Sequence, residues 1–419
     1  MRVLLASESF PPVCGGSGWS TYELARGLGR RGHDVIVVQP KPAAPPGRHD
    51  REYDDIRVLE YGFPAPSLPY VRNYFKNERL YAALTDVLSD VIAQERVDLV
   101  HGQHVLTCLP SIEAAHRRHL PAVCTVRDYW PVCYWSDLIY SRRSAALCPE
   151  CSAGMMTRCI RPRGGPLWPL ALPMIPYMRA NLARKRSGLA AADAIIAVSS
   201  RIASDLRVRA PEIAATRLEI IPNPVDVAGL RARARAGSAP LEGPYALYLG
   251  KLAPNKGTSR LVDVIERARL EWPLVVVGDG PDRPALESRA RASRRDVRFT
   301  GWVDQAQTTA WLAHASLLVF PSRGPESLSR VLLEASALGV PVAAMNTGGT
   351  PDIVKHGETG LLSSTPEALA DDVRRLVDSE PLRQQLGTAA ARHAERTFDA
   401  RSIVEKIESL YLELRRGFH

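Results

Sequence analysis

The chain has 419 residues, of which 45% are hydrophobic and 24% charged, a composition typical of a folded globular protein. A length of this order predicts two domains, each large enough to bury its own core. No stretch offers the roughly 18 uninterrupted apolar residues of a membrane-spanning helix. The opening "MRVLLASESFPP" has too short an apolar run for a signal peptide, so we expect a cytoplasmic protein.

Charge and cysteine content narrow the class of partner. Lys and Arg total 54 against 45 Asp and Glu, and this net charge of +9 favours anionic partners such as nucleotides, phosphates or an acidic membrane face. The arginines are scattered over predicted helices such as "RLVDVIERARL" without interleaved aromatic residues, so we expect solvated helix faces and no nucleic-acid partner. Seven cysteines, an odd number without a secretory signal, indicate thiols in a reducing compartment.

Short apolar runs alternate with helical patterns along the whole chain. "RVLLAS" precedes a helix over 20–30, "DVIVVQP" precedes a long helix near 78–94, and "DLVHGQ" precedes a helix near 110–118 and the run "AVCTV". The rhythm resumes with "AIIAVSS", "LEIIPNP", "YALYLGK", "LVVVGDG", "VRFTGW", "LLVFPS" and "PVAAMN". Continuous Val, Ile and Leu runs are typical of strands buried on both faces, so the pattern predicts an α/β protein with two doubly wound units.

The domain boundaries follow from where this rhythm stops. We expect a first domain over 1–230 and a second over 231–397, because Ala, Arg, Gly and Pro replace the strand pattern over 226–244. The amphipathic segment 398–419 is predicted to be a helix that packs back on the first domain. The cysteine-rich stretch 131–178, with "PLWPLALPMIPYM", is predicted to be an insert; it is either a contact with a membrane surface or, the favoured interpretation, a buried or acceptor-lining segment.

One segment predicts a helix with two unexplained acidic residues. "PESLSRVLLEASALGVP" has an apolar stripe at helical spacing and carries Glu326 and Glu334, with Glu326 expected at or before the helix start. Eight residues rise about 12 Å on a straight helix. The carboxylates of a glycoside hydrolase lie roughly 5–10 Å apart, so this spacing suits two ends of one long ligand better than a hydrolytic pair. In isolation, two glutamates that merely face solvent remain the alternative.

Residues around this segment predict a site for a diphosphate. Backbone amides at the helix start would favour an anion there, and they belong to Ser327, Leu328 and Ser329. Lys251 and Lys256, in "YLGKLAPNKG", follow a different predicted strand, although two loop lysines alone are more often solvated charges.

The N-terminal "PPVCGGSGWSTYELARGL" has the order strand, glycine loop and helix. Gly15 and Gly16 lack side chains, so the backbone there can approach a ligand closely. Taken alone this pattern is weak.

Together, "GGSGWSTYELARGLGRRGHDV", "IPNPVD", "GKLAPNKG", "GDG" and "PSRGPESLSRVLLEASALGVPVAAMNTGGTPDIVKHGETGLL" resemble the retaining glycosyltransferases of family four. The resemblance implies the GT-B fold, with two Rossmann-like doubly wound domains facing a central cleft. It implies transfer of a sugar from a nucleoside-diphosphate sugar to an acceptor hydroxyl with retention and without a catalytic metal. It assigns the donor sugar to Glu326, the ribose to Glu334, the base to the backbone near Val303, and the diphosphate to Lys251 and Lys256 with the loop amides.

The chain departs from the family pattern at three places. Ser327 to Ser329 replace a common Gly-Phe-Gly, and Lys251 stands where arginine is frequent. In "TVRDYW", Arg127 occupies the place of a histidine beside Asp128, which excludes catalysis by an imidazole at that position. We include Arg127 and Asp128 among the candidate catalytic residues, with a surface ion pair as the alternative for Arg127. Two other functions stay open: a same-fold epimerase or phosphorylase, and a non-catalytic nucleotide-sugar-binding partner.

The four cysteines of the insert predict a structural zinc site. Cys148 and Cys151 form a Cys-x-x-Cys knuckle, and Cys133 and Cys159 flank it. Four thiolates satisfy tetrahedral zinc, and a long loop without clear periodicity would need such a clamp. Free thiols, a disulfide pair and an iron–sulfur cluster are the alternatives.

Overall fold

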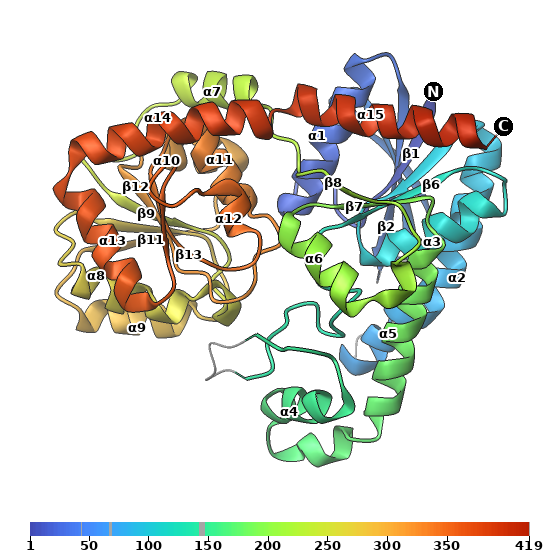
Figure 1. Cartoon of the computed structure of the whole chain (residues 1–419), viewed down its shortest axis with the longest axis horizontal. Coiled ribbons are helices and arrows are strands. Elements are labelled where there is room, and N and C mark those ends of the chain that lie inside the picture. The colour runs from blue at the N-terminus through green and yellow to red at the C-terminus, as the bar shows by residue number, and fades with distance from the viewer. Residues whose placement is uncertain (43, 67–68, 142–146, 419) are drawn as a thin grey trace.

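The computed structural model describes the whole chain except residues 43, 67–68, 142–146 and 419. Two β-sheets, each flanked by helices, lie side by side and account for the two halves of the chain (Figure 1).

The first sheet has eight strands in the order β3-β4-β2-β1-β5-β6-β7-β8. Its strands are β1 (Arg2–Ala6), β2 (Asp34–Pro42), β3 (Gly47–Tyr53), β4 (Ile56–Phe63), β5 (Leu99–Gly102), β6 (Ala122–Val126), β7 (Ala194–Ala197) and β8 (Leu218–Ile220). Neighbouring strands are parallel except at the edge, where β3 pairs antiparallel with β4. The sequence pattern did not predict this edge hairpin, because β3 reads "GRHDREY" and is largely exposed.

The second sheet has six parallel strands in the order β11-β10-β9-β12-β13-β14. They are β9 (Ala246–Leu249), β10 (Leu274–Val277), β11 (Val297–Gly301), β12 (Leu317–Phe320), β13 (Val342–Met345) and β14 (Leu361–Ser363). Sequences such as "LVVV" and "LLVF" are buried along their whole length, which is the expected consequence of covering both faces with helices.

Helices cover both sheets. Those before residue 220 are α1 (Gly16–Arg30), α2 (Pro69–Glu95), α3 (Val105–His116), α4 (Ala153–Gly164), η1 (Gly165–Ala171), α5 (Met174–Ala190), α6 (Ser200–Arg209) and η2 (Pro211–Ile213). Those after it are α7 (Val227–Ala236), η3 (Pro254–Lys256), η4 (Thr258–Arg260), α8 (Leu261–Arg267), α9 (Arg283–Ala292), α10 (Gln305–Ala313), α11 (Arg330–Leu338), α12 (Thr350–Ile353), α13 (Pro366–Asp378), α14 (Glu380–Thr397) and α15 (Ala400–Gly417).

The stretch 226–244, expected as a linker, begins with a helix. Asp226 caps α7 by accepting a hydrogen bond from the Gly229 amide at 2.9 Å, and the Ala and Arg residues that follow are good helix formers. Helix α7 packs on α10 and α11, so this stretch belongs structurally with the second sheet.

The last helix, α15, returns to the first half of the chain. It runs on from α14 across the top of the molecule and lies over α1 (Figure 1). Its buried residues Ile403, Val404 and Tyr411 share a core with Leu24 and Leu28 of α1. The chain therefore crosses between the two halves twice.

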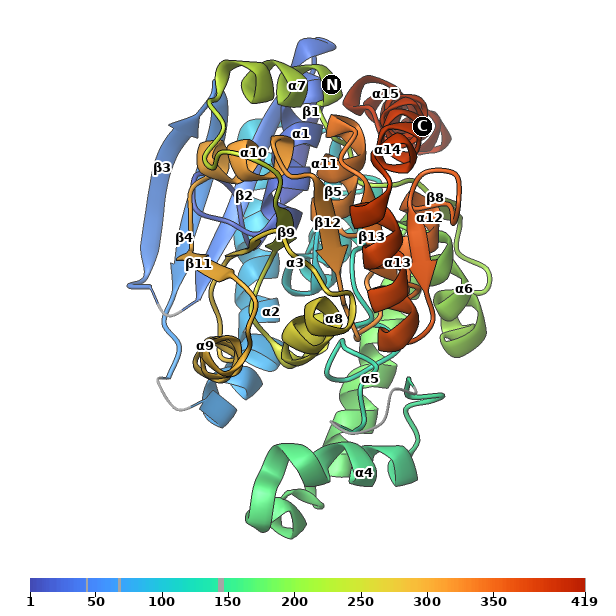
Figure 2. The ribbon, with the colours of Figure 1, turned by 90° about the vertical axis from the view of Figure 1, so that its left-hand side faces the viewer.

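The later part of the cysteine-rich insert, from α4 onward, projects away from both sheets. Helix α4, η1 and the first turns of α5 lie below the first sheet (Figures 1 and 2). Met156, Ile160 and Met178 form a small separate core within it.

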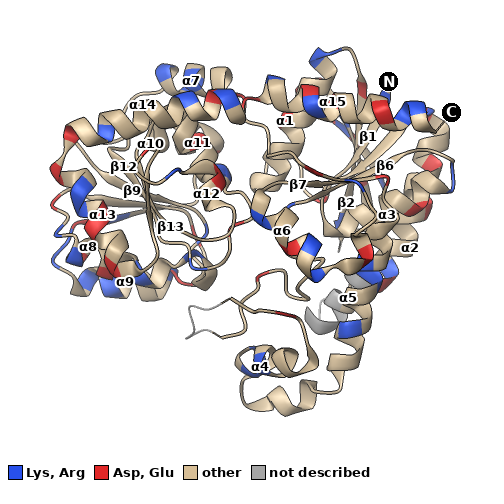
Figure 3. Cartoon of the chain, in the orientation of Figure 1, with Lys and Arg blue, Asp and Glu red and all other residues tan. Residues whose placement is uncertain are grey.

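Charged residues alternate in sign on the outer helices, including α8, α9 and α13 (Figure 3). Arg289 pairs with Asp263 and Glu266, for example, so these arginines do not form a single basic stripe. None of the helices in the described part of the chain is both long enough and apolar enough to cross a membrane.

Candidate functional site

A cavity of about 620 Å³ lies between the two halves, lined by residues from both. It lies beyond the carboxyl ends of β9, β10 and β12, where open parallel sheets bind ligands. A smaller cavity of about 220 Å³ adjoins it and shares several of its lining residues.

These cavities bring most of the predicted site residues together. The large cavity is lined by Gly15, Gly16, Arg127, Lys251, Lys256, Val303, Glu326, Ser327, Leu328 and Ser329. Glu334 lines the smaller one, together with Val303. Asp128 lines neither cavity.

Glu326 is paired with a lysine from a distant part of the second half. Its side chain is only 8% exposed, and Lys256 Nζ lies 2.8 Å from Oε1 and 3.0 Å from Oε2. Ser322 also donates a hydrogen bond to Oε1. The sequence separation of Lys256 and Glu326 gave no hint of this ion pair, which joins η3 to the loop after β12.

The loop between Glu326 and α11 differs from the expectation. Helix α11 begins at Arg330, so Ser327, Leu328 and Ser329 precede its first turn. Within the described structure the amides of these residues donate no hydrogen bond, and the residues line the cavity. The role expected for the amides stays a prediction, but it belongs to a loop and not to the helix start.

The conformation of this loop depends on close contact between the backbone of Glu326 and the backbone of Gly348 and Gly349. The amide of Gly349 donates to the carbonyl of Glu326 at 2.6 Å. Gly348 has a φ of +55°, and a Cβ there would lie 1.9 Å from the same carbonyl oxygen. Only glycine fits this position, so "NTGGT" is the segment that fixes the backbone of Glu326.

Glu334 is tied to an arginine that sequence reasoning missed. Arg330 Nε donates to Glu334 Oε1 at 2.8 Å, and Arg330 Nη2 lies 3.6 Å from Glu23 on α1. Arg330 therefore connects the second half of the chain to the first. The spacing of four residues between Arg330 and Glu334 is the signal that would have indicated the pair.

The glycine loop meets the same arginine. Gly15 is the N-cap of α1, and a Cβ on it would meet no other atom within 4 Å. A Cβ on Gly16 would lie 3.2 Å from Arg330 Cβ. The start of α1 is thus open toward the cavity at Gly15 and packed against α11 at Gly16.

Arg127 is buried and faces the cavity. It is 7% exposed, and its Nε donates to Asn223 Oδ1 at 3.0 Å while Nη1 donates to the Gln103 carbonyl at 3.3 Å. It forms no ion pair with any described residue, so the alternative of a surface ion pair is wrong. Burial lowers the pKa of Arg127 to about 10, which leaves a fixed positive charge beside the cavity.

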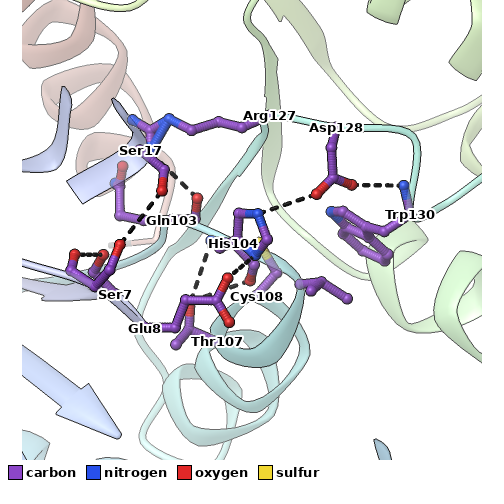
Figure 4. A network of polar contacts seen from close by, with 12 residues as sticks. Ser7, Glu8, Ser17, Gln103, His104, Thr107, Cys108, Arg127, Asp128 and Trp130 are labelled. Atoms are coloured by element: carbon purple, nitrogen blue, oxygen red, sulfur yellow. Dashed lines mark hydrogen bonds and ion pairs between the residues drawn. The ribbon is translucent and has the colours of Figure 1, made fainter. Parts of the chain in front are cut away.

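Behind Arg127 lies a histidine that the sequence analysis did not single out. His104 stands between two carboxylates, pairing through Nδ1 with Glu8 and through Nε2 with Asp128 at 3.1 Å (Figure 4). Burial lowers the pKa of His104, but the two carboxylates outweigh burial and raise it well above its ordinary value. His104 lies just after the carboxyl end of β5, where open parallel sheets bind ligands, and this position could have indicated it as a candidate site residue.

The predicted zinc site is not supported. Among the residues that the structure describes, no group of three or more His, Cys, Asp or Glu side chains is arranged to hold a metal ion. Burial raises the pKa of all four thiols, Cys133, Cys148, Cys151 and Cys159.

Two of these thiols have other partners. Arg163 Nη1 donates a hydrogen bond to the sulfur of Cys159 at 2.9 Å. The thiol of Cys148 donates to the Glu150 carbonyl at 2.9 Å. All four are free cysteines in this structure.

Two Rossmann-like halves with a cavity of about 620 Å³ between them are the architecture of the GT-B fold. Residues 14–228 match the family described as Glycosyltransferase Family 4, and residues 243–379 match Glycosyl transferases group 1. The chain belongs to glycosyltransferase family 4 and is a glycosyltransferase. The predicted family membership is confirmed.

Individual relatives agree with this membership. Glycogen synthase of Mycobacterium tuberculosis is 26% identical over 100% of this chain and 96% of its own. D-inositol 3-phosphate glycosyltransferase of Streptomyces avermitilis is 36% identical over 49% of each chain.

Solved structures confirm the predicted fold. Sucrose-phosphate synthase of Thermosynechococcus elongatus superposes with a TM-score of 0.73 at 20% identity, over 99% of both chains. HepE of Anabaena, solved in complex with UDP-glucose, has a TM-score of 0.66 at 17% identity over 99% of this chain and 100% of its own.

Proposed function

We propose that the protein transfers a glycosyl group from a nucleoside-diphosphate sugar to an acceptor hydroxyl with retention at the anomeric carbon. The observation that carries this proposal is the cavity in which Lys251, Lys256 and Arg127 face the same space as the loop that bears Glu326. Three cations and unpaired loop amides suit a diphosphate, because charge-assisted hydrogen bonds to phosphate oxygens are strong.

In this proposal the donor lies along the cavities. Its nucleoside occupies the smaller cavity, where Glu334 accepts hydrogen bonds from the ribose and the backbone near Val303 holds the base. The diphosphate lies against Lys251, Lys256 and the loop amides, and the sugar lies at Glu326. The first domain, over 1–230, supplies the acceptor side, and the second, over 231–397, supplies most donor contacts.

The chemical step breaks the bond between the anomeric carbon and the diphosphate oxygen and forms a bond from the same carbon to the acceptor oxygen. The acceptor attacks from the face that the diphosphate leaves, and its proton passes to an oxygen of the leaving diphosphate. Lys251, Lys256 and Arg127 stabilise the charge that develops on the diphosphate, which is the electrostatic contribution expected of such a site. The proposal needs no catalytic metal ion.

A ligand screen tests this function. Nucleoside diphosphates and their sugars are added singly, with UDP first because HepE of Anabaena was solved with UDP and UDP-glucose. A ligand at 100 times its dissociation constant stabilises the fold by about 2.7 kcal/mol, which a thermal melt detects. Turnover of the stabilising nucleotide sugar is then measured with and without acceptors. Failure of every nucleotide to bind would contradict the proposal, as would turnover that needs no acceptor.

A further inference from the structure

A second cavity, of about 580 Å³, lies outside the donor site, among α2, α5 and the cysteine-rich insert. Its walls are mainly aromatic and apolar, with contributions from Tyr134, Trp135, Ile160, Met174, Tyr177 and Met178. This volume, and apolar walls with few polar groups, are typical of sites for small molecules.

Lys185 is a buried cation in this wall. Lys185 is 5% exposed, and it makes no hydrogen bond or ion pair with any residue that the structure describes. Its ammonium lies 5.9 Å from the ring centroid of Tyr134. Burial lowers the pKa of Lys185 to about 8, because an unpaired ammonium is costly to bury.

Among the charged side chains of the wall, Arg163 has polar partners and Lys185 has none among the described residues. Arg163 is satisfied, since it donates to Asp137 at 2.6 Å and lies over the Trp135 ring at 5.1 Å. The indole nitrogen of Trp135 is buried and has no hydrogen-bond partner in the described residues. The cavity thus presents the Lys185 ammonium, which has no ion-pair partner among the described residues, within a mainly apolar wall, and this favours an anionic oxygen on a ligand.

Sequence neighbours of the His104–Asp128 pair line both this cavity and the donor cavity. Val105, in the wall of the second cavity, follows His104, whose imidazole pairs with Asp128 at 3.1 Å. Asp128 follows Arg127, which lines the donor cavity. The attraction of Asp128 also acts on Lys185. The second cavity therefore lies on the first-domain side of the donor site, which is the side expected to bind the acceptor.

We propose that this cavity binds the glycosyl acceptor, an amphiphile whose apolar chain or ring fills the aromatic wall and whose single anionic group lies against Lys185. The role as acceptor rests on the proposed function, whereas the binding of an amphiphilic anion does not. Such an anion comes either from a soluble molecule or from an anionic lipid. Leu167 and Leu170, 68% and 76% exposed on η1 beside the cavity, are placed to meet an apolar phase in the second case.

Calorimetry with three probes tests the binding. Hexyl phosphate carries both features, 1-hexanol carries only the apolar chain, and inorganic phosphate carries only the anion. Hexyl phosphate is expected to bind the wild-type protein at least about tenfold more tightly than either partial probe. Lys185→Met is expected to abolish this preference and leave the affinity for 1-hexanol unchanged. Equal affinity of hexyl phosphate for wild type and Lys185→Met would overturn the proposal.

Two further variants control for folding and for nonspecific charge. Ala171→Trp fills the cavity and is expected to remove binding of both hexyl phosphate and 1-hexanol, while Lys355→Met, at an exposed lysine of the second half, is expected to change neither. UDP affinity is measured for every variant. A wild type that binds UDP but not hexyl phosphate would overturn the second-cavity proposal alone. One that binds hexyl phosphate but no nucleotide would overturn the donor function and the acceptor role that rests on it, and would leave the binding of an amphiphilic anion standing.

Vesicles and kinetics distinguish the source of the anion and the acceptor role. Binding to phosphatidic acid vesicles but not to phosphatidylcholine vesicles, lost in Lys185→Met, would identify a lipid; hexyl phosphate binding without vesicle binding would identify a soluble acceptor. With hydroxyl-bearing amphiphiles, Lys185→Met is expected to raise KM for anionic acceptors at least about tenfold with little change in kcat. Equal use of anionic and neutral amphiphiles by the wild type would overturn the acceptor assignment.

Discussion

The ammonium of Lys256 spans both carboxylate oxygens of Glu326, at 2.8 and 3.0 Å, inside the cavity between the two halves. Each side chain therefore neutralises the other before any ligand arrives. A bound diphosphate would compete with Glu326 for the ammonium, and the carboxylate released in this way would be available to hydroxyl groups of the donor sugar.

Lys256→Ala is expected to weaken binding of a nucleoside diphosphate by about 10- to 100-fold and binding of the nucleoside much less, because hydrogen bonds to charged groups contribute about 1.5–3 kcal/mol. The ratio of the two affinities, from calorimetry, is the measurement. An equal loss for both ligands would mean that Lys256 serves only to hold Glu326. Lys355→Ala, which removes an exposed lysine of the second half, is the matched control.

Glu326→Gln is expected to lower turnover by about 10- to 100-fold without weakening binding of the nucleotide that lacks its sugar, because Lys256 then no longer has a carboxylate that competes with the diphosphate. Turnover is lowered because Glu326 is assigned to the sugar, and an amide is a weaker acceptor than a carboxylate. Steady-state kinetics and nucleotide binding are compared on the same preparation. The assignment would fail if both quantities fell together.

Glu334→Gln is expected to weaken nucleotide binding by roughly tenfold, since a carboxylate can accept two hydroxyl hydrogen bonds and the amide oxygen accepts fewer. Arg330 loses its ion pair with Glu334 in this variant and keeps the one with Glu23, so the melting temperature is measured as well. Glu395→Gln, at a glutamate that is exposed and paired with Arg231, is the control for loss of a salt bridge. Unchanged nucleotide affinity would leave Glu334 as a structural partner of Arg330.

His104 is expected to make stability depend on pH. Its pKa is raised in the folded protein by Glu8 and Asp128, so its charged form is stabilised by folding. This contribution is fully present below the unfolded pKa of about 6.5 and is lost as pH rises through the folded pKa. The difference in unfolding free energy between wild type and His104→Gln should therefore shrink as pH rises above 6.5, as denaturant titrations would show.

His101 is expected to make the unfolding free energy depend on pH in the opposite direction. Burial, with a smaller effect from Arg127, lowers its pKa well below the ordinary value, so it stays neutral in the fold. As pH falls below about 6.5 the unfolded chain gains a proton that the folded chain does not, and the fold is destabilised. His101→Gln should weaken this dependence on acid. The same pH slope in both variants would contradict the two assignments.

The sequence predicted the α/β architecture, and it singled out most of the residues that prove to line the cavities, because continuous apolar strands and glycine loops leave clear local patterns. It did not predict the β3–β4 hairpin, since a polar edge strand lacks the alternation that reveals a strand. It placed the start of α11 too early because Pro325 is typical of a first helical turn, whereas Gly348 and Gly349 hold Glu326 in a loop.

Other features of the site depend on contacts between distant segments. Arg330 reaches Glu23, and His104 reaches Glu8 and Asp128, across separations that no local pattern encodes. The spacing of the cysteines is compatible with zinc, but it does not reveal that the side chain of Arg163 lies beside Cys159. The domain boundaries and the roles of the individual donor residues stay predictions.

The two places where the chain passes between its halves lie against each other. Val225 donates to the Phe398 carbonyl at 3.0 Å and accepts from the Ala400 amide at 2.9 Å, so the outgoing and returning segments form a short paired ribbon. Two covalent attachments at one point restrain sliding of the halves but permit rotation about that point. Rotation of the halves about this point would change the width of the donor cavity. The ion pair of Arg330 with Glu23 joins the two halves, so such a rotation would either preserve or break it.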